Sequence, residues 1–393
     1  GNMSLSSISS KSPLFDRNTL FLDLEYKNSE KYPRFVDFTE EITGNDLIES
    51  QLIQNKTNHR KDKFSNQFLT NIFHRLPRDT LENHYVLGDY IGGGEFSQVF
   101  ECTCRKTFTK FAVKCINKKS MSNREFESLK QEIAISSSLK HPGICSVREI
   151  FETSKASYII QELAKHGNLH ERLKTRTYFM EGQAARTVGR ILQALNYLHL
   201  NGVVHRDIKL ENILCMSVSD DTDVKITDFG FASYETDLMK YEEACGTPEY
   251  VAPEVLMGKE YGKAIDVWSL GVVTYALLCG YIPFPQTSIH DLFTSIINAE
   301  YHFHADSWRL VSLEAKNFIR CMLEPDPEQR YTTEQLLAHS WIQGHSDDVP
   351  QVPPAPKVVR KKMCNESVPK ETNILINRKL KGRYHWKNKS INR

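Results

Sequence analysis

The amino-acid sequence predicts an α+β fold in which a small lobe rich in strands precedes a larger helical lobe. In residues 85–117, β-branched and aromatic residues alternate with polar ones, which is typical of half-buried strands. After residue 168, apolar residues recur at intervals of three and four, the spacing of amphipathic helices. The 393 residues are 40% hydrophobic and 25% charged, a globular composition that excludes collagen-like, coiled-coil and wholly disordered chains.

The individual elements are expected in the following order. Strands lie within 85–104 and at 110–117, a helix with Asn123 as its N-cap lies at 123–139, and a further strand lies at 157–163. Helices are expected at residues 169–175, 182–201, 264–280, 288–298, 311–323 and 333–341. No internal repeat is visible.

The most apolar stretch of the chain spans residues 267–284. Its 18 residues are long enough to cross a bilayer. Several Ser, Thr and Gly residues interrupt the stretch, however, Asp266 and Trp268 stand at its start, and Pro283 ends it. We therefore expect a buried core helix and no membrane span.

Composition divides the chain into three parts. Residues 1–84 are rich in Ser, Asn and Lys and are expected to form a partly disordered extension with one helix at 64–73. Residues 85–342 hold 27 basic and 33 acidic side chains, net −6, whereas residues 343–393 hold 12 and 4, net +8. A basic tail therefore follows a mildly acidic body.

Charge and cysteine content narrow the function classes. The net charge of the whole chain is +1, which argues against a general nucleic-acid binder. The nine cysteines are odd in number and lack zinc-ligand spacing, so they are expected as free thiols in a reducing compartment. No signal-peptide pattern opens the sequence. We expect a cytoplasmic or nuclear location.

Three glycines stand where two strands are expected to join, in the run IGGGEFSQV at residues 91–99. Without a Cβ, their backbone can approach phosphate oxygens closely and present its N–H groups to the anion. A simple hairpin turn would explain the same glycines.

A lysine lies inside the apolar run FAVK at residues 111–114. A charge in such a strand needs an anionic partner. Glu132, which falls within the expected helix at 123–139, is the candidate. The pair indicates either a phosphate-binding lysine and its support or a structural salt bridge.

Three further runs concentrate polar residues: VVHRDIKLEN at 203–212, ITDFG at 226–230 and CGTPEYVAPE at 245–254. With the glycine run and Lys114, they stand in the order and at the spacing of the eukaryotic protein kinases. From about residue 85 to residue 342, the chain resembles this family. Because five motifs agree, chance agreement is negligible, although each motif alone could be a turn or a salt bridge.

The resemblance implies a two-lobed kinase domain at 85–342, with an N-lobe at 85–162 and a C-lobe at 165–342, followed by the basic tail at 343–393. It further implies transfer of the γ-phosphate of ATP, with Mg²⁺, to Ser or Thr of protein substrates. Lys209 and Thr247 resemble residues of serine/threonine rather than tyrosine kinases. The alternative is a pseudokinase scaffold on the same fold.

The resemblance also implies roles for individual residues. Asp207 would accept the proton of the substrate hydroxyl and Lys209 would steady the transferred phosphate, while Asn212 and Asp228 would hold magnesium. The catalytic set is Lys114, Glu132, Asp207, Lys209 and Thr247. The nucleotide set is Ile91, Gly92, Gly93, Gly94, Val99, Ala112, Lys114, Gln161, Glu162, Ala164 and Leu214. Such charges suit phosphoryl transfer, in which catalysis is mostly positioning and neutralisation.

Other residues resemble structural supports of the family. Asp266 would anchor the backbone of the catalytic loop, and Glu254 with Arg330 would form a buried ion pair. Three positions depart from the family pattern. Ser97 stands where the third glycine of the phosphate-covering loop is usual. Ser136 replaces a bulky apolar residue, which weakens a contact with Phe229, and Glu243 stands where an activating phosphorylated residue is usual.

The kinase group and the tail leave alternatives open. The segment 268–284 resembles the calcium/calmodulin-dependent group, in which the chain after the last helix often blocks the substrate cleft. Residues 231–232 and 245–254 resemble instead the cyclic-nucleotide-dependent group. The basic residues of the tail alternate with apolar ones, a pattern suited to calmodulin or another acidic regulator. A solvated basic tail or a nuclear-localisation signal would have the same composition.

Overall fold

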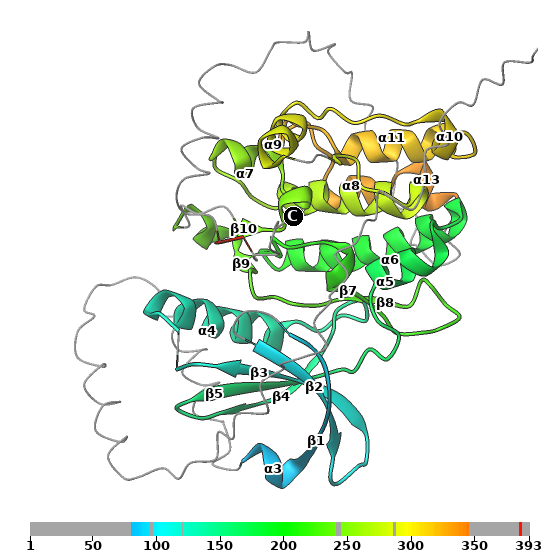
Figure 1. The fold of residues 1–393 in the computed structure, drawn as a ribbon. Coiled ribbons are helices and arrows are strands. Elements are labelled where there is room, and N and C mark those ends of the chain that lie inside the picture. The colour runs from blue at the N-terminus through cyan, green and yellow to red at the C-terminus, as the bar shows by residue number, and fades with distance from the viewer. Residues whose placement is uncertain are drawn as a thin grey trace, which may run out of the picture. The chain divides into compact units, whose positions relative to one another are not determined.

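The computed structural model describes residues 80–93, 97–119, 121–240, 245–285 and 288–345, together with 385–386. The helix expected at 64–73, Glu243 and most of the basic tail therefore lie outside the described residues. Within them, strands dominate up to residue 161 and helices after residue 168, which confirms the predicted α+β class (Figure 1).

The N-lobe is built on one antiparallel sheet with the strand order β1-β2-β3-β5-β4. Its strands are β1 Tyr85–Gly93, β2 Ser97–Cys104, β3 Lys110–Asn117, β4 Val147–Glu152 and β5 Ala156–Gln161. A short helix, α3 Leu81–His84, precedes β1. Strand β3 has the bounds that the sequence predicts, whereas β4 was not expected.

The register of the sheet brings four predicted nucleotide residues to one face. Val99 of β2 lies opposite Lys114 of β3, and Ala112 of β3 lies opposite Gln161 of β5. Residues opposite each other in a sheet point to the same side, as do residues two apart along a strand. Val99, Ala112, Lys114 and Gln161 therefore share one face.

Helix α4 Asn123–Ser138 packs on that face, where Leu129 and Ile133 meet Ile116 and Ile159 of the sheet (Figure 1). The predicted N-cap, Asn123, is wrong. Ser122 caps the helix, because its side chain accepts a hydrogen bond from the Glu125 N–H and the Glu125 carboxylate accepts one from the Ser122 N–H.

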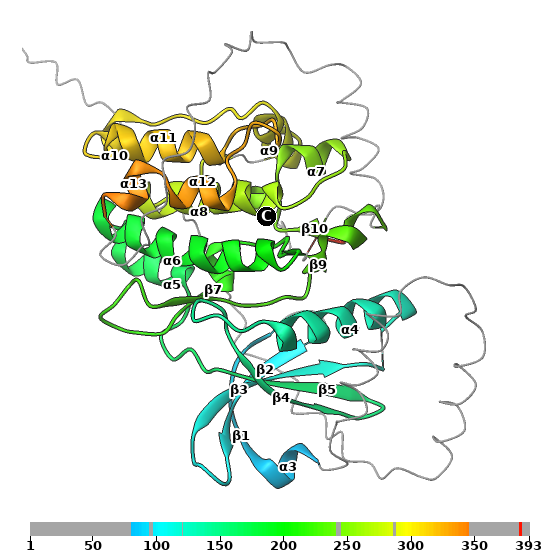
Figure 2. The same ribbon diagram turned by 180° about the vertical axis from the view of Figure 1, so that it is seen from behind.

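The C-lobe is helical and surrounds helix α8 (Figures 1 and 2). Its helices are α5 Leu169–Arg176, α6 Glu181–Leu200, α7 Pro253–Met257, α8 Ala264–Cys279, α9 Ile289–Ile297, α10 Ala305–Trp308, α11 Leu313–Met322, α12 Thr333–Leu337 and α13 Ser340–Gln343. Residues 265–279 of α8 are all buried, which confirms the core helix predicted there. None of the helices in the described ranges combines the length and apolar character that a membrane crossing requires.

The single helix expected at 333–341 is wrong, because two short helices occupy this region. Helix α12 ends at Leu337 and α13 begins after His339, whose ring accepts a hydrogen bond from the Trp341 N–H. His339 therefore caps the start of α13, and this hydrogen bond competes with extension of α12 beyond Leu337. Both helices pack against α6, as Figure 2 shows.

Two short strand pairs lie within the C-lobe, and a third joins the C-lobe to the basic tail. They join β6 Val203–Val204 to β9 Ser233–Tyr234, β7 Ile213–Cys215 to β8 Val224–Ile226, and β10 Cys245–Gly246 to β11 His385–Trp386. Strand β6 leads into the polar run at 203–212, and β8 leads into ITDFG. These pairs therefore fix the loops that carry the predicted catalytic residues. The seven cysteines with described side chains are buried, free thiols, as expected.

A forked ion pair braces the C-lobe. The Arg330 Nη1 and Nη2 donate to the Glu254 Oε1 and Oε2 at 2.7 and 2.9 Å, and both side chains are fully buried. The guanidinium also lies over the Trp268 ring, 5.1 Å from its centroid. Burial removes the water that could otherwise replace either partner.

We predict that Arg330→Ala lowers the free energy of unfolding by about 3–5 kcal/mol, because it leaves the Glu254 carboxylate buried without its partner. Arg330→Lys, which keeps the charge but loses the fork, should lose less. Chemical denaturation of the full chain measures both. The control is Lys263→Ala, which breaks a half-exposed pair with Glu235 and should cost less than about 1 kcal/mol. Equal losses for Arg330→Ala and the control would contradict the prediction.

Candidate active site

The Lys114 ammonium lies between two carboxylates. Its Nζ is 2.6 Å from the Glu132 Oε1 of α4 and 3.1 Å from the Asp228 Oδ1 after β8. Burial alone would lower the pKa of Lys114, but the charges of Asp228 and Glu132 outweigh it and raise the pKa above its ordinary value. The lysine therefore stays charged between the two acidic side chains.

The Asp207 carboxylate is fixed by donors on both oxygens. Thr247 Oγ1 donates to Oδ1 at 3.0 Å, while Asn212 Nδ2 and Lys209 Nζ approach Oδ2 at 2.9 and 2.8 Å. Lys209 Nζ also donates to Thr247 Oγ1 at 2.7 Å. The sequence-predicted residues Asp207, Lys209, Asn212 and Thr247 thus form one connected network.

Asp266 of α8 anchors the backbone that carries Asp207. Its two oxygens accept the N–H groups of His205 and Arg206 at 2.8 Å each, and His199 Nε2 lies 3.0 Å away. Burial raises the pKa of Asp266, but hydrogen bonding and charge from His199, with help from His205, lower it overall. An ionised carboxylate accordingly sits beneath the loop.

Two residues of the site hold a left-handed backbone. Arg206, which precedes Asp207, has φ +66°, and Asp228 has φ +63°. Such angles are unfavourable for residues with a Cβ and persist only where the surroundings impose them. The two bonds to Asp266 and the packing of the His205 ring on Phe229, with centroids 5.1 Å apart, impose them here.

The strand pair β7–β8 brings the two predicted metal ligands together. Asn212 immediately precedes β7 and Asp228 follows β8, and Ile213 lies opposite Ile226 in the antiparallel register. The Thr227 N–H donates to the Asn212 carbonyl at 3.0 Å. The start of one strand and the end of the other therefore share one edge.

The donor set at that edge fits Mg²⁺. The Asn212 Nδ2 donates to Asp207, so the amide oxygen of Asn212 is the atom that can bind a cation. Asp228 adds a carboxylate. Mg²⁺ takes few protein oxygens and completes its shell with phosphate and water. The described side chains hold no cluster of three or more His, Cys, Asp or Glu residues that suits a metal held by protein alone.

The glycine run is only partly described, because Gly94 lies outside the described residues. A Cβ added at Gly93 would lie 2.7 Å from the Ser97 carbonyl oxygen, so the hairpin itself requires that glycine. A Cβ added at Gly92 would meet nothing within 4 Å. Packing therefore does not explain Gly92, whereas close approach of a phosphate would. Ile91 lies in β1, next to this residue.

The adenine side of the predicted site lies around the connector after β5. Gln161 ends β5, and the Glu162 N–H donates to the Ser146 carbonyl at 3.2 Å. Leu214 lies in β7, and Ala164 follows Glu162 by two residues. The structure thus places Val99, Ala112, Gln161 and Leu214 of the nucleotide set on β2, β3, β5 and β7, and Glu162 and Ala164 on the connector between the lobes.

Some contacts at the site were not predicted. Ser136, the expected weak point of α4, donates back to the Glu132 carbonyl at 2.7 Å. Gln131 Nε2 instead donates to Ser233 Oγ of β9 at 3.1 Å and so ties α4 to the C-lobe. Lys225 of β8 binds the Glu162 carboxylate. Neither Gln131 nor Lys225 belongs to a motif, so the sequence offered no signal for them.

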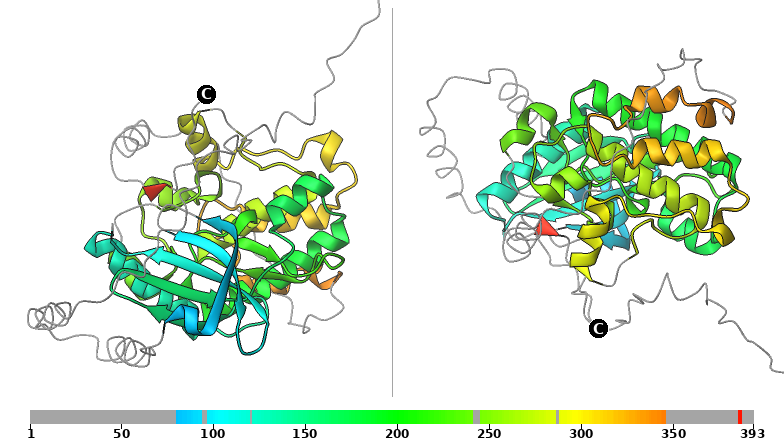
Figure 3. Two further views of the ribbon diagram at one scale, coloured as in Figure 1. Left: turned by 60° about the horizontal axis from the view of Figure 1, so that its bottom comes forward. Right: turned by 90° about the horizontal axis from the view of Figure 1, so that it is seen from above.

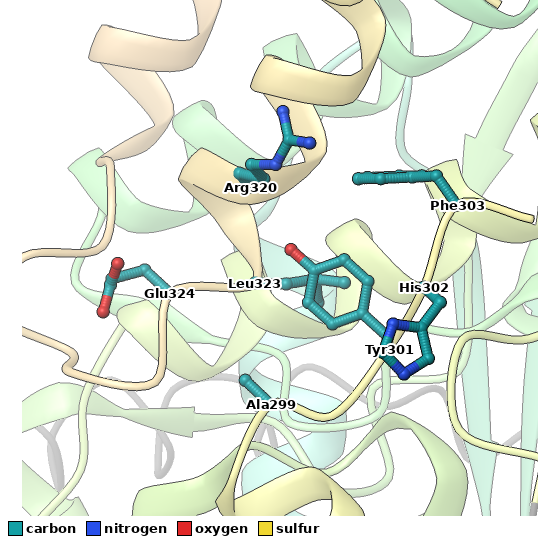
Figure 4. A pocket seen from close by; sticks show the side chains of 7 residues that line it. All are labelled: Ala299, Tyr301, His302, Phe303, Arg320, Leu323 and Glu324. Atoms are coloured by element: carbon teal, nitrogen blue, oxygen red, sulfur yellow. The ribbon is translucent and has the colours of Figure 1, made fainter. Parts of the chain in front are cut away.

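A cavity of about 440 Å³ lies elsewhere in the C-lobe, between the segment after α9 and the end of α11 (Figure 4). It is lined by Ala299, Tyr301, His302, Phe303, Arg320, Leu323 and Glu324. The Arg320 guanidinium lies 5.0 Å from the centroid of the Phe303 ring. No residue of the predicted catalytic or nucleotide sets lines this cavity, so it is separate from the phosphate-transfer site.

Comparison with known proteins agrees with this geometry. Residues 85–342 match the family model described as "Protein kinase domain". A calcium/calmodulin-dependent protein kinase type 1 of Caenorhabditis elegans is 41% identical over 271 residues, which are 69% of this chain and 77% of that protein.

Two further relatives extend the comparison. A probable myosin light chain kinase of Dictyostelium discoideum is 40% identical over 274 residues, 70% of this chain and 78% of that protein. The rat calcium/calmodulin-dependent protein kinase type 1B is 40% identical over 266 residues, 68% and 77% of the two chains. No feature of the site favours the pseudokinase alternative. The chain belongs to the protein kinase family, as an ATP-dependent serine/threonine kinase most similar to the calcium/calmodulin-dependent group.

Proposed function

We propose that the network around Asp207 and the ion cluster around Lys114 divide the phosphate transfer between them. The observation that carries this proposal is the position of Lys114 between Glu132 and Asp228, within a fold that also fixes both oxygens of Asp207. The acceptor is the hydroxyl of a Ser or Thr in a protein substrate.

Asp207 receives the acceptor hydroxyl. Its carboxylate is held by Thr247, Lys209 and Asn212, so it can accept the hydroxyl proton without reorienting. The Lys209 ammonium beside it offsets the negative charge that develops on the transferred phosphoryl group. Thr247 couples the two residues, because it bonds to both.

Lys114 holds the α- and β-phosphates of ATP, and Glu132 holds Lys114. Asn212 and Asp228 would hold Mg²⁺, which would supply neutralisation of the charge on the phosphates. Val99, Ala112 and Leu214 would supply apolar contacts to the nucleotide base, and the backbone of Glu162 and Ala164 would bind its polar edge.

We expect Asp228→Ala and Asp207→Ala each to lower kcat by about three orders of magnitude or more, because each removes a group that acts on charge in the transition state. Initial rates with Mg-ATP and a degenerate Ser/Thr peptide library measure the loss. Thermal unfolding should show that both variants remain folded.

Asp220→Ala provides the matched control. Asp220 is an exposed carboxylate between β7 and β8 that bonds only to Thr222 nearby, and its removal should leave the rate within about twofold. Near-wild-type turnover of Asp228→Ala would show that this residue holds no essential metal.

We further propose that the basic tail regulates the kinase and that calmodulin releases it. The observation that favours this second proposal is the parallel pairing of β11 with β10, in which Cys245 lies opposite His385 and Gly246 opposite Trp386 (Figure 3, where β11 is the red arrow). A Cβ at Gly246 would lie 3.0 Å from the Arg206 carbonyl oxygen, so β10 runs directly against the catalytic loop. Thr247, the next residue, bonds to Asp207.

A tail strand at this edge competes with a protein substrate for the backbone beside Asp207. The tail carries net +8 and the domain net −6, so charge favours their association. Two of the three relatives named above, those of Caenorhabditis elegans and rat, are calcium/calmodulin-dependent by name. An acidic regulator such as calmodulin could capture the apolar and basic residues of the tail and free the edge.

Deletion of residues 350–393 is predicted to raise peptide phosphorylation severalfold and to abolish its dependence on calcium and calmodulin. Deletion of residues 387–393 alone, which keeps β11, should leave the enzyme inhibited. Rates with and without calcium and calmodulin, together with calmodulin binding to the full chain, distinguish the two deletions. An unchanged rate after the longer deletion, with no calmodulin binding, would refute tail regulation.

A further inference from the structure

A salt bridge outside the catalytic motifs spans the connector between the lobes. The Lys225 Nζ of β8 lies 2.8 Å from both the Oε1 and the Oε2 of Glu162, the first residue after β5. The Glu162 Oε2 also accepts the backbone N–H of Ser146 at 3.0 Å. The side chains of Lys225 and Glu162 are only 17% and 32% exposed. One carboxylate therefore joins the connector, the segment before β4, and β8.

The backbone around this carboxylate is equally constrained. The Glu162 N–H donates to the Ser146 carbonyl at 3.2 Å, and the Cys145 N–H donates to the Ile226 carbonyl at 2.9 Å. The Cys145 thiol lies 3.7 Å from the Glu162 carbonyl oxygen, and burial raises its pKa to about 12, so the thiol keeps the proton that it donates. The Glu162 carbonyl thus has a fixed position and direction.

Lys225 also lies close in the chain and in the sheet to residues assigned to the nucleotide site. In the β7–β8 pair it is directly opposite Leu214, so both side chains leave the same face. Leu214 is the residue assigned beneath the adenine, and Asp228 follows Lys225 by three residues. The salt bridge consequently links the adenine end of the site to its phosphate end.

We propose that Lys225 is a positioning residue for the nucleotide: its ion pair with Glu162 holds the connector carbonyl that meets the adenine amino group and thereby sets the affinity and the adenine preference of the kinase. This inference rests on the proposed function, in which the Glu162 backbone contacts the base. A guanine would present a carbonyl oxygen to the same carbonyl, and a fixed connector rejects that contact more strongly than a mobile one.

The test uses initial rates of the full chain with Lys225→Met, which keeps an unbranched apolar side chain and removes the charge. A partly buried ion pair of this kind supports an expected rise of about fivefold in the KM for ATP. The kcat and the KM for the peptide should stay within about twofold, because the connector binds the base equally in the ground and transition states. The ratio of kcat/KM for GTP to that for ATP should rise.

Two further variants show whether the effect belongs to the pair. Glu162→Gln should raise the KM for ATP in the same direction, and the double variant should be no worse than Lys225→Met alone, because the interaction is already lost. Direct ADP binding provides a readout independent of catalysis and should weaken by the same factor.

Lys118→Met is the matched control. Lys118 forms an ion pair with Glu152 that is at least as buried as the pair of Lys225 with Glu162. Glu152 ends β4, whereas the Glu162 carboxylate contacts the segment before β4. The control variant should lower the unfolding temperature without changing the KM for ATP. An unchanged KM and unchanged GTP discrimination in Lys225→Met would overturn the inference, as would an equal change in Lys118→Met. Since Asp228→Ala tests the proposed function separately, a silent Lys225→Met beside an inactive Asp228→Ala refutes only the positioning role.

Discussion

The Lys114 ammonium joins three parts of the chain that are far apart in sequence. It lies on β3, its first partner Glu132 lies on α4, and its second partner Asp228 lies in the loop after β8. Because all three side chains are largely buried, loss of one partner would leave a charge that water cannot solvate. The position of α4 on the sheet, the approach of the C-lobe and the orientation of Asp228 therefore depend on one another. A shift of α4 away from the sheet would separate Glu132 from Lys114 and disturb the phosphate end of the site.

The C-lobe contributes the rigid half of this arrangement. Asp266 belongs to α8, whose residues 265–279 are buried, and it holds the backbone of His205 and Arg206. The strained φ angles of Arg206 and Asp228 are sustained by this fixed support. Asp207 is consequently presented by a well-packed helix, whereas Lys114 is presented by a sheet that contacts the C-lobe through a few polar side chains. Packing therefore fixes the position of Asp207, whereas charge fixes the position of Lys114.

The sequence predicted the parts of the fold that depend on local pattern. Strand β3 has a strong alternation and was predicted with its observed bounds, and the long helices α6 and α8 were predicted to within two residues. The two- and three-residue strands β6 to β9 were not predicted, because so short a strand is defined by its partner rather than by its own residues. Strand β4, a six-residue strand at the edge of the sheet, was also missed. At α4, the Ser122 and Glu125 pair was a readable capping box that would have corrected Asn123. The catalytic residues were predictable because they lie in motifs of fixed spacing, whereas contacts made by residues outside the motifs, such as that of Gln131 with Ser233, were not.

Several contacts near the junction of the lobes involve residues that belong to no motif. Ser136 offers α4 no bulky side chain for Phe229, and its hydroxyl turns back onto the Glu132 carbonyl of its own helix. The amide of Gln131 spans 102 residues of sequence to reach Ser233, and Lys225 spans 63 residues to reach Glu162. Both add directional polar bonds to the apolar packing of Ile135, Leu139 and Ile144 on the C-lobe core. Such bonds have defined geometry but a small net energy in partly exposed positions. These bonds orient α4 and the connector relative to β8 and β9 and contribute little to the free energy of unfolding.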